Sequence, residues 1–293
     1  MRAVTQSASP AFILALSCVN QPGIVAAVAT HIFNSGGNIL EASQFDDLSS
    51  GRFFMRVVFN FVDQAPSLDA VRGGFALLIS RFGMEISLRE RGVKQNVMLL
   101  ASKFDHCLAD VLYRWRTGEL TMNIAGIVAN HPRETYAHLN LDGLPFHYLP
   151  VTADTKAEQE AKLLGLIERS NTDLVVLARY MQVLSNDLSA KLAGRCINIH
   201  HSFLPGFKGA RPYHAAHARG VKLIGATAHY VTADLDEGPI IEQDVERITH
   251  ADSPEDLIRK GRDIERRVLA RAIAAHLEGR VIISGARTIV FRD

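Results

Sequence analysis

The sequence predicts an α/β protein with a ferredoxin-like N-terminal domain followed by a domain built on a mostly parallel sheet. Two observations support this fold class. Strand-like and helix-like segments follow each other in a different order in the two parts of the chain, and a polar, glycine-bearing stretch separates those parts. A chain of 293 residues is also long enough for about two domains.

The first part reads as strand, helix, strand, strand, helix and strand, after a flexible tail over residues 1–10. The first helix has Val25, Val28 and Ile32 at helical spacing, and a Pro-Gly turn precedes it. The predicted segments are, in order, 12–18, 24–33, 38–45, 52–61, 68–82 and 85–89. This order is the ferredoxin-like arrangement, which we assign to residues 11–90.

The second part begins after a predicted linker over residues 91–95, which is polar and contains Gly92. In the remaining chain, 96–293, strand-like segments alternate with helical stretches, as expected for a parallel sheet with helices on both faces. The predicted strands are 96–101, 122–128, 147–151, 174–177, 196–199 and 225–231. Capping boxes that start at Thr155 and Ser253 should open two of the helices.

Composition narrows the classes of protein. The chain is 47% hydrophobic and 22% charged with a formal net charge of +1, which predicts neither nucleic-acid binding nor a membrane surface. The apolar run 11–19 lacks a signal-peptide cleavage pattern, and no transmembrane stretch is present, so we read that run as a strand. The three cysteines, widely spaced and odd in number, favour a reducing cytoplasm.

The most informative segment is Cys196-Ile197-Asn198-Ile199-His200, which continues into His201. Side chains alternate along a strand, so Asn198 and His200 should share one face, with the two isoleucines on the opposite face and His201 pointing away from His200. An amide and an imidazole can both donate hydrogen bonds to a carbonyl oxygen that gathers negative charge under nucleophilic attack. The pair therefore indicates acyl-group chemistry, although buried polar side chains also serve as ordinary hydrogen-bonded parts of a fold.

A second polar segment follows the predicted strand that ends near Val231. The turn contains Asp234, Asp236 and Glu237, followed by Gly238-Pro239, a run that can hold a carboxylate rigidly toward a neighbouring strand. Asp236 is a candidate base or water-holding group. The alternative from the residues alone is that all three carboxylates are solvated turn residues.

Several motifs together resemble the folate-dependent formyltransferases: Asn198-Ile199-His200, Leu204-Pro205, Phe207-Lys208-Gly209 and Leu235-Asp236-Glu237-Gly238-Pro239. The resemblance implies that Asn198, His200 and Asp236 are catalytic and that the second domain has a Rossmann-like formyltransferase fold. The segment 178–185 resembles the one that lines the pterin pocket in that family. On this basis the substrate-binding residues are expected to be Met181, Leu184, Gln182, Tyr180, Val231 and Gly209.

The N-terminal part resembles an ACT domain through its element order and through Asn20-Gln21-Pro22-Gly23-Ile24-Val25. An ACT domain implies regulation by a small amino-acid effector or a role in dimerisation, with Asn20, Gln21 and Gly23 at the effector site. Gly23 could equally serve only to permit the tight strand-to-helix turn. We expect a homo-oligomer, since an ACT-like sheet edge can pair with another copy.

With this first domain, and with the segments 102–108 and 201–205, the chain resembles the deformylase branch of the formyltransferase family over nearly all residues from Phe12 onward. The resemblance implies hydrolysis of 10-formyltetrahydrofolate to formate and tetrahydrofolate, with folate as the substrate and no further cofactor. The alternatives are a formyltransferase acting on an amine and a non-catalytic folate or amino-acid sensor. The segment 101–107 has no glycine, which disfavours a phosphorylated acceptor. The histidine spacing disfavours a metal site.

Overall fold

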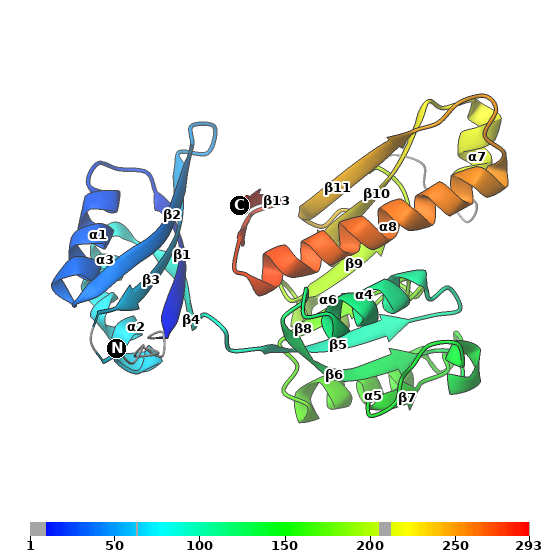
Figure 1. Ribbon diagram of the computed structural model, residues 1–293, viewed down its shortest axis with the longest axis horizontal. Helices are drawn as coiled ribbons and strands as arrows, with labels where there is room; N and C mark the ends of the chain where they lie inside the picture. The colour runs from blue at the N-terminus through cyan, green and yellow to red at the C-terminus, as the bar shows by residue number, and fades with distance from the viewer. Residues whose placement is uncertain (1–9, 63, 205–211, 293) are drawn as a thin grey trace, which may run out of the picture. The chain divides into compact units, whose positions relative to one another are not determined.

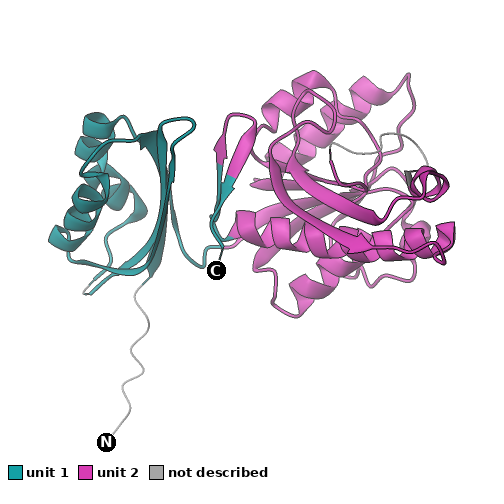
Figure 2. Cartoon of the chain, turned by 90° about the horizontal axis from the view of Figure 1, so that it is seen from above, with its two compact units in different colours: residues 1–93, 278–282, 289–293 teal, residues 94–277, 283–288 magenta. Residues whose placement is uncertain are grey.

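The structure is a computed structural model that describes residues 10–62, 64–204 and 212–292. The chain divides into two compact units, which Figure 2 shows in teal and magenta. Unit 1 comprises residues 1–93, 278–282 and 289–293, and unit 2 comprises residues 94–277 and 283–288. The short C-terminal strands β12 (Val281–Ser284) and β13 (Arg287–Val290) pair as a separate two-stranded sheet.

Unit 1 has a four-stranded sheet of order β2-β3-β1-β4, and its neighbouring strands are antiparallel. Its three helices lie on one face of the sheet (Figure 1). The elements are β1 (Ala11–Val19), α1 (Ile24–Asn34), β2 (Gly37–Asp47), β3 (Arg52–Phe61), α2 (Leu68–Gly74), α3 (Ala76–Phe82) and β4 (Glu85–Glu90). Strand order and connections are those of the ferredoxin-like arrangement. The core lies between helices and sheet, with Leu14, Val28 and Phe59 almost fully buried.

The helix predicted over 68–82 is wrong as a single element, because it breaks into α2 and α3 at Phe75. Two consecutive glycines, Gly73 and Gly74, precede the break, and glycine weakens a helix interior. The amide of Phe75 donates to the carbonyl of Arg72, three residues earlier, so the last turn of α2 tightens before α3 begins.

Unit 2 is built on a seven-stranded sheet of order β11-β10-β9-β8-β5-β6-β7. The strands from β7 to β9 run parallel, and β10 and β11 run antiparallel to their neighbours, so the sheet is mostly parallel as predicted. Its strands are β5 (Gln95–Ala101), β6 (Met122–Ala129), β7 (Phe146–Tyr148), β8 (Leu174–Leu177), β9 (Cys196–His200), β10 (Leu223–Tyr230) and β11 (Ile240–Arg247). Predicted strand 147–151 ends early because Pro150 cannot donate to a ladder.

The helices of unit 2 cover this sheet (Figure 1). They are α4 (His106–Arg116), the 3₁₀ helix η1 (Arg133–Tyr136), α5 (Lys156–Arg169), α6 (Asn186–Lys191), α7 (Pro212–Arg219) and α8 (Pro254–Leu277). Ser253 forms its capping box with Asp256 at the start of α8. The box predicted at Thr155 is wrong, since the Thr155 hydroxyl accepts instead from the amide of Thr152.

Candidate functional site

The register between β9 and β10 gathers polar side chains on one face of the sheet of unit 2. Asn198 lies opposite His229, and His200 lies opposite Thr227. Directly opposed residues of an antiparallel pair share a face, so all four side chains lie on the same side. Ile197 and Ile199 are buried on the other face, as the predicted alternation requires.

The turn between β10 and β11 brings Asp236 back onto this face. Its Oδ2 lies 3.1 Å from Nδ1 of His200, and its Oδ1 lies 3.6 Å from Nε2 of His229. The amide nitrogen of Asn198 lies 3.3 Å from the same His229 Nε2. The three residues predicted to be catalytic are therefore held in one cluster, and His229 joins them.

The backbone of this turn is constrained at two points. Asp236 has a φ of 58°, in the left-handed region that is uncommon for a residue other than glycine. The amide of Tyr230 donates to the carbonyl of Pro239 at 2.9 Å and closes the base of the turn. Gly238 packs so closely that a Cβ there would lie 1.7 Å from the carbonyl oxygen of Tyr230. Only glycine fits at this position.

The contacts within the cluster determine the charge of Asp236. Burial alone would raise the pKa of the Asp236 carboxyl, but the contact with His200, together with the nearby ring of His229, outweighs burial and holds this pKa well below its usual range. Nδ1 of His229 lies 2.9 Å from the carbonyl oxygen of Tyr230, which can only accept, so this nitrogen carries a proton. Asp236 is therefore an ionised acceptor near neutral pH.

The end of β9 is fixed by hydroxyl groups. Nε2 of His200 lies 2.9 Å from the hydroxyl of Ser202. The buried Thr227 hydroxyl donates to the carbonyl of Ser202 and accepts from the amide of Leu204. These bonds fix the chain just after the strand, so the His200 ring has a defined position against Asp236.

The prediction that His201 points away from His200 is wrong. The two rings stack with centroids 4.8 Å apart and an interplanar angle of 22°. Strand β9 ends at His200, so the alternation of side chains ends there too. Nη1 of Arg179 lies 2.6 Å from Nδ1 of His201. Burial, reinforced by Arg179 and His200, lowers the pKa of His201 to about 4.

A buried polar cluster behind this histidine pair was not predicted from the sequence. Glu265 of α8 is 1% exposed and contacts His106 Nε2 at 2.7 Å, the Tyr213 hydroxyl at 2.8 Å and Arg179 Nε at 3.3 Å. Among the described residues, His106, Cys107 and Glu265 place ligand atoms close enough to hold a metal ion. Both Glu265 oxygens already contact other groups, and the adjacent guanidinium of Arg179 would repel a cation, so the set is ill suited to a metal.

The predicted substrate-binding residues lie in different environments. Met181 is 54% exposed and has a φ of 60°, in the segment that follows β8, and Gln182 is half-buried beside it. Tyr180 and Leu184 belong to the core, where the Tyr180 hydroxyl contacts Gln159 at 2.6 Å, and Val231 packs against that core. Gly209 lies outside the described residues. Their contact with substrate stays a prediction.

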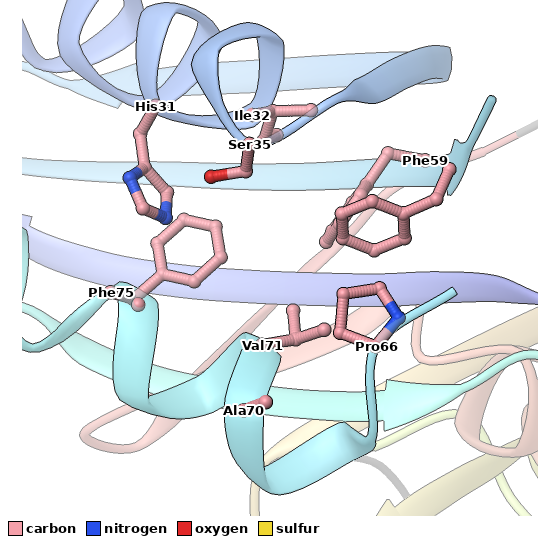
Figure 3. A pocket seen from close by; sticks show the side chains of 10 residues that line it. His31, Ile32, Ser35, Phe59, Pro66, Ala70, Val71 and Phe75 are labelled. Carbon is pink, nitrogen blue, oxygen red and sulfur yellow. The ribbon is translucent and has the colours of Figure 1, made fainter. Parts of the chain in front are cut away.

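Unit 1 holds the predicted effector residues and a cavity that they do not line. Gly23 caps α1 with a φ of 91°, and the Asn20 amide donates to the carbonyl of Gly51. The cavity has a volume of about 190 Å³, and the ring of His31 meets that of Phe75 at its wall (Figure 3). It is lined by His31, Ile32, Ser35, Phe59, Phe61, Pro66, Ala70, Val71, Gly74 and Phe75. An effector at Asn20, Gln21 and Gly23 would therefore bind elsewhere.

None of the helices within the described ranges combines the length and the apolar character needed to cross a membrane. The long helix α8 has charged side chains along its exposed side and buries mainly small and aliphatic residues.

Comparison with known proteins connects this site to a family. Residues 95–273 match the formyl transferase family. Similar curated proteins include the formyltetrahydrofolate deformylase of Corynebacterium sp. strain P-1, which is 49% identical over 281 residues that cover 96% of this chain and 98% of the relative. Another is the formyltetrahydrofolate deformylase of Escherichia coli K12, 39% identical over 284 residues that cover 95% of this chain and 97% of the relative.

The chain is also similar to solved structures of formyltetrahydrofolate deformylases and of related transformylases. A formyltetrahydrofolate deformylase from Burkholderia mallei superposes with a TM-score of 0.90 at 54% identity and covers 97% of this chain and 100% of its own. Glycinamide ribonucleotide transformylase 1 from Symbiobacterium toebii superposes with a TM-score of 0.63 at 29% identity, over 70% of this chain and 98% of its own.

Proposed function

This chain belongs to the formyltetrahydrofolate deformylase family, and from that premise we propose that it hydrolyses 10-formyltetrahydrofolate with Asn198, His200 and Asp236 as its catalytic residues. The products are formate and tetrahydrofolate. The observation that carries the assignment of these residues is the 3.1 Å contact between Asp236 and His200, on the sheet face that also holds Asn198. Asp236 is the acceptor, Asn198 and His200 are the donors, and the neutral ring of His201 lies beside them. Together they form a site suited to attack on a carbonyl.

The proposed reaction begins with a water molecule held by the Asp236 carboxylate. Its oxygen bonds to the formyl carbon, and the carbonyl electrons move to the oxygen, which accepts hydrogen bonds from Asn198 Nδ2 and from the Nε2–H of His200. Nδ1 of His200 faces Asp236, so Nε2 is the nitrogen left for the substrate, and it would exchange its contact with the Ser202 hydroxyl for one with the oxyanion. The oxyanion electrons then re-form the carbonyl, and the electron pair of the carbon–nitrogen bond leaves with the folate nitrogen, which takes one proton of the attacking water; the second proton is released as formic acid ionises to formate.

The low pKa of Asp236 bears on its role. A carboxylate whose pKa lies well below its usual range is a weak proton acceptor, but it remains charged and keeps its hydrogen bonds across the neutral pH range. Asp236 is therefore proposed to orient the water and the His200 ring, with no lasting protonation of its own. Two oriented donors lower the barrier by a few kcal/mol, since the loss of one such donor costs roughly 3 kcal/mol.

Substrate recognition is proposed to involve the segment after β8. Met181 supports this proposal, because its apolar side chain is exposed and its backbone is left-handed in the segment that follows a strand of the central sheet. Gln182, Tyr180, Leu184, Val231 and Gly209 complete the predicted pterin pocket. Folate is the substrate here, and the proposal includes no further cofactor.

Unit 1 is proposed to be an ACT domain that regulates the enzyme or assembles it into a homo-oligomer. The ferredoxin-like strand order and the Gly23 turn support this. Asn20, Gln21 and Gly23 are the proposed contacts of an amino-acid effector. The buried, unpaired state of Cys18, Cys107 and Cys196 supports the proposed cytoplasmic location. Light scattering and activity with added amino acids test the assembly and the effector.

The deciding experiment measures formate release from 10-formyltetrahydrofolate in a buffer without amines. We expect equimolar formate and tetrahydrofolate, with a rate that an added amine does not change. The Asp236→Asn variant, run beside the native protein, should lose most of this rate, which excludes a contaminating activity. Strict dependence on an added amine would assign the site to formyl transfer and refute the hydrolysis.

A further inference from the structure

The stacked rings of His200 and His201 pose a charge problem. Two parallel imidazoles with centroids 4.8 Å apart repel each other strongly if both carry a proton. The proposed mechanism needs a donor proton on the ring that faces Asp236. The protein must therefore keep the neighbouring ring neutral, or the two rings will compete for one proton.

Arg179 supplies the discrimination. Its Nη1 lies 2.6 Å from Nδ1 of His201, and a guanidinium can only donate hydrogen bonds. Nδ1 of His201 must therefore accept, which places the ring proton on Nε2 and leaves the ring neutral. That Nε2 is buried and has no hydrogen-bond partner among the described residues, so no acceptor there helps the ring to carry a second proton.

Glu265 attracts Arg179 through an ion pair, in which Nε of Arg179 makes no hydrogen bond to a described residue. The carboxylate is 1% exposed and lies 3.3 Å from Nε of Arg179, whose side chain is 11% exposed. It also contacts His106 and Tyr213, so its own position is fixed from α4 and α7. Arg179 has a φ of 64°, an unfavourable backbone region for arginine, so tertiary contacts must hold it there.

Ionisable groups from several elements face this histidine pair. Asp236 comes from the turn after β10, His229 from β10, Arg179 from the segment after β8, Tyr213 from α7 and Glu265 from α8, and His106 at the start of α4 contacts Glu265. Glu265 balances Arg179, and Asp236 is the carboxylate that faces His200. This leaves one neutral ring, His201, between two pairs of opposite charge.

We infer that Arg179, held by Glu265, keeps His201 neutral and thereby confines the positive charge of the stacked pair to His200. The inference rests on the proposed function and deepens it. Arg179 and Glu265 are positioning residues, since neither contacts His200 and both act through the ring of His201. Arg179 and Glu265 are far apart in the sequence, and His201 follows a strand end, so only the fold unites them.

The test measures the protonation of the imidazoles in the substrate-free protein. Long-range ¹H–¹⁵N correlation spectra recorded over pH 5–8 report which ring nitrogens carry a proton. In the native protein, Nδ1 of His201 should stay without a proton throughout. In Arg179→Met, His201 should gain a proton within this range, and Arg179→Lys, which retains a cation that only donates, should restore the native pattern. Arg195→Met is the matched control, because Arg195 is a half-buried arginine bonded to the Thr172 carbonyl at the other end of β9.

The second readout is the pH profile of kcat/KM for formate release. In Arg179→Met the alkaline limb of kcat/KM should move to lower pH by about one unit, which lowers kcat/KM on that limb about tenfold, because the shared proton resides less on His200. Glu265→Gln removes a carboxylate whose charge raises the pKa of His201 and keeps an oxygen that can accept from Arg179, so His201 should stay neutral in this variant. Arg195→Met should stay within about twofold of the native protein.

A native His201 that titrates within pH 5–8 would overturn the inference, even if every variant failed to fold. So would an Arg179→Met protein with an unchanged His201 tautomer and an unchanged pH profile. Failure of the hydrolysis itself gives a different result, because the spectra need no substrate. A neutral His201 in a protein that releases no formate would leave the charge assignment standing and refute only the proposed reaction.

Discussion

Replacement of Gly238 by alanine tests how rigidly the turn must hold Asp236. The added methyl group would lie 1.7 Å from the carbonyl oxygen of Tyr230 and 3.2 Å from Nδ1 of His229. The first contact is with backbone, so no side-chain rotation relieves it. Either the turn moves away from β10, or the end of β10 moves, and the second movement disturbs the bond between His229 and the Tyr230 carbonyl.

The magnitude follows from the overlap. Real Cβ atoms stay beyond 3.0 Å from such neighbours, so relief requires a movement of at least about 1.3 Å. Asp236 is two residues away and contacts His200 at 3.1 Å, so a shift of this size takes the pair out of hydrogen-bonding range. Since a misplacement of roughly 1 Å can cost about a hundredfold in rate, we expect kcat/KM to fall about 100-fold.

The assay compares formate release by native protein, Gly238→Ala and the control Gly165→Ala. Gly165 lies in helix α5 of the same unit, where a Cβ would meet only the flexible end of Arg169 at 3.0 Å. The control should retain activity within about twofold and gain up to about 1 kcal/mol in unfolding free energy from its helical propensity. Urea titrations of all three proteins separate loss of activity from loss of fold.

A Gly238→Ala protein that unfolds at the native urea concentration and keeps near-native kcat/KM would refute this reasoning. It would mean that the turn can adapt by more than 1 Å without cost to the reaction. The close packing of Gly238 would then serve stability alone, and the position of Asp236 would not be critical.

Other substitutions give further tests. Asn198→Ala removes one proposed oxyanion donor and should lower kcat about 100-fold or more with little change in KM, measured by steady-state formate release. Asp236→Asn should lower kcat by about 10² to 10⁴ while near-ultraviolet circular dichroism stays native. His201→Gln tests whether the pKa of His201 is about 4 in the folded protein, below the value of 6.5 for the unfolded chain. Because the unfolded state binds the proton more tightly, the native protein should lose about 2 to 3 kcal/mol more than the variant between pH 7.5 and pH 4.5, and equal losses in urea titrations would contradict this.

Strand periodicity predicted much of the site. Alternation along 196–199 correctly placed Asn198 and His200 on one face, because β9 is a regular strand with a buried apolar side. The turn run at 234–239 identified Asp236 as a candidate, because Gly238-Pro239 has strong turn chemistry. That this carboxylate reaches His200 depends on the register of β10 against β9, which a single sequence does not contain.

Sequence patterns failed where tertiary contacts override a local rule. His201 was expected to diverge from His200, but the strand ends there, and Arg179 draws the ring into a stack. Glu265 occupies a buried position in the apolar stripe of α8, where only its contacts with α4, α7 and Arg179 reveal a role. The sequence from Thr155 matches a capping box, but the Thr155 hydroxyl accepts from the amide of Thr152 instead. In the Arg179 and Glu265 cases the partners are far apart in the sequence.

The most direct test of the central claim is hydrolysis in water enriched in ¹⁸O. If a water molecule attacks the formyl carbon near Asp236, each formate must carry one oxygen from the solvent, and mass spectrometry should find a single label in nearly every product molecule after one turnover. Formate that forms without solvent oxygen would contradict water attack.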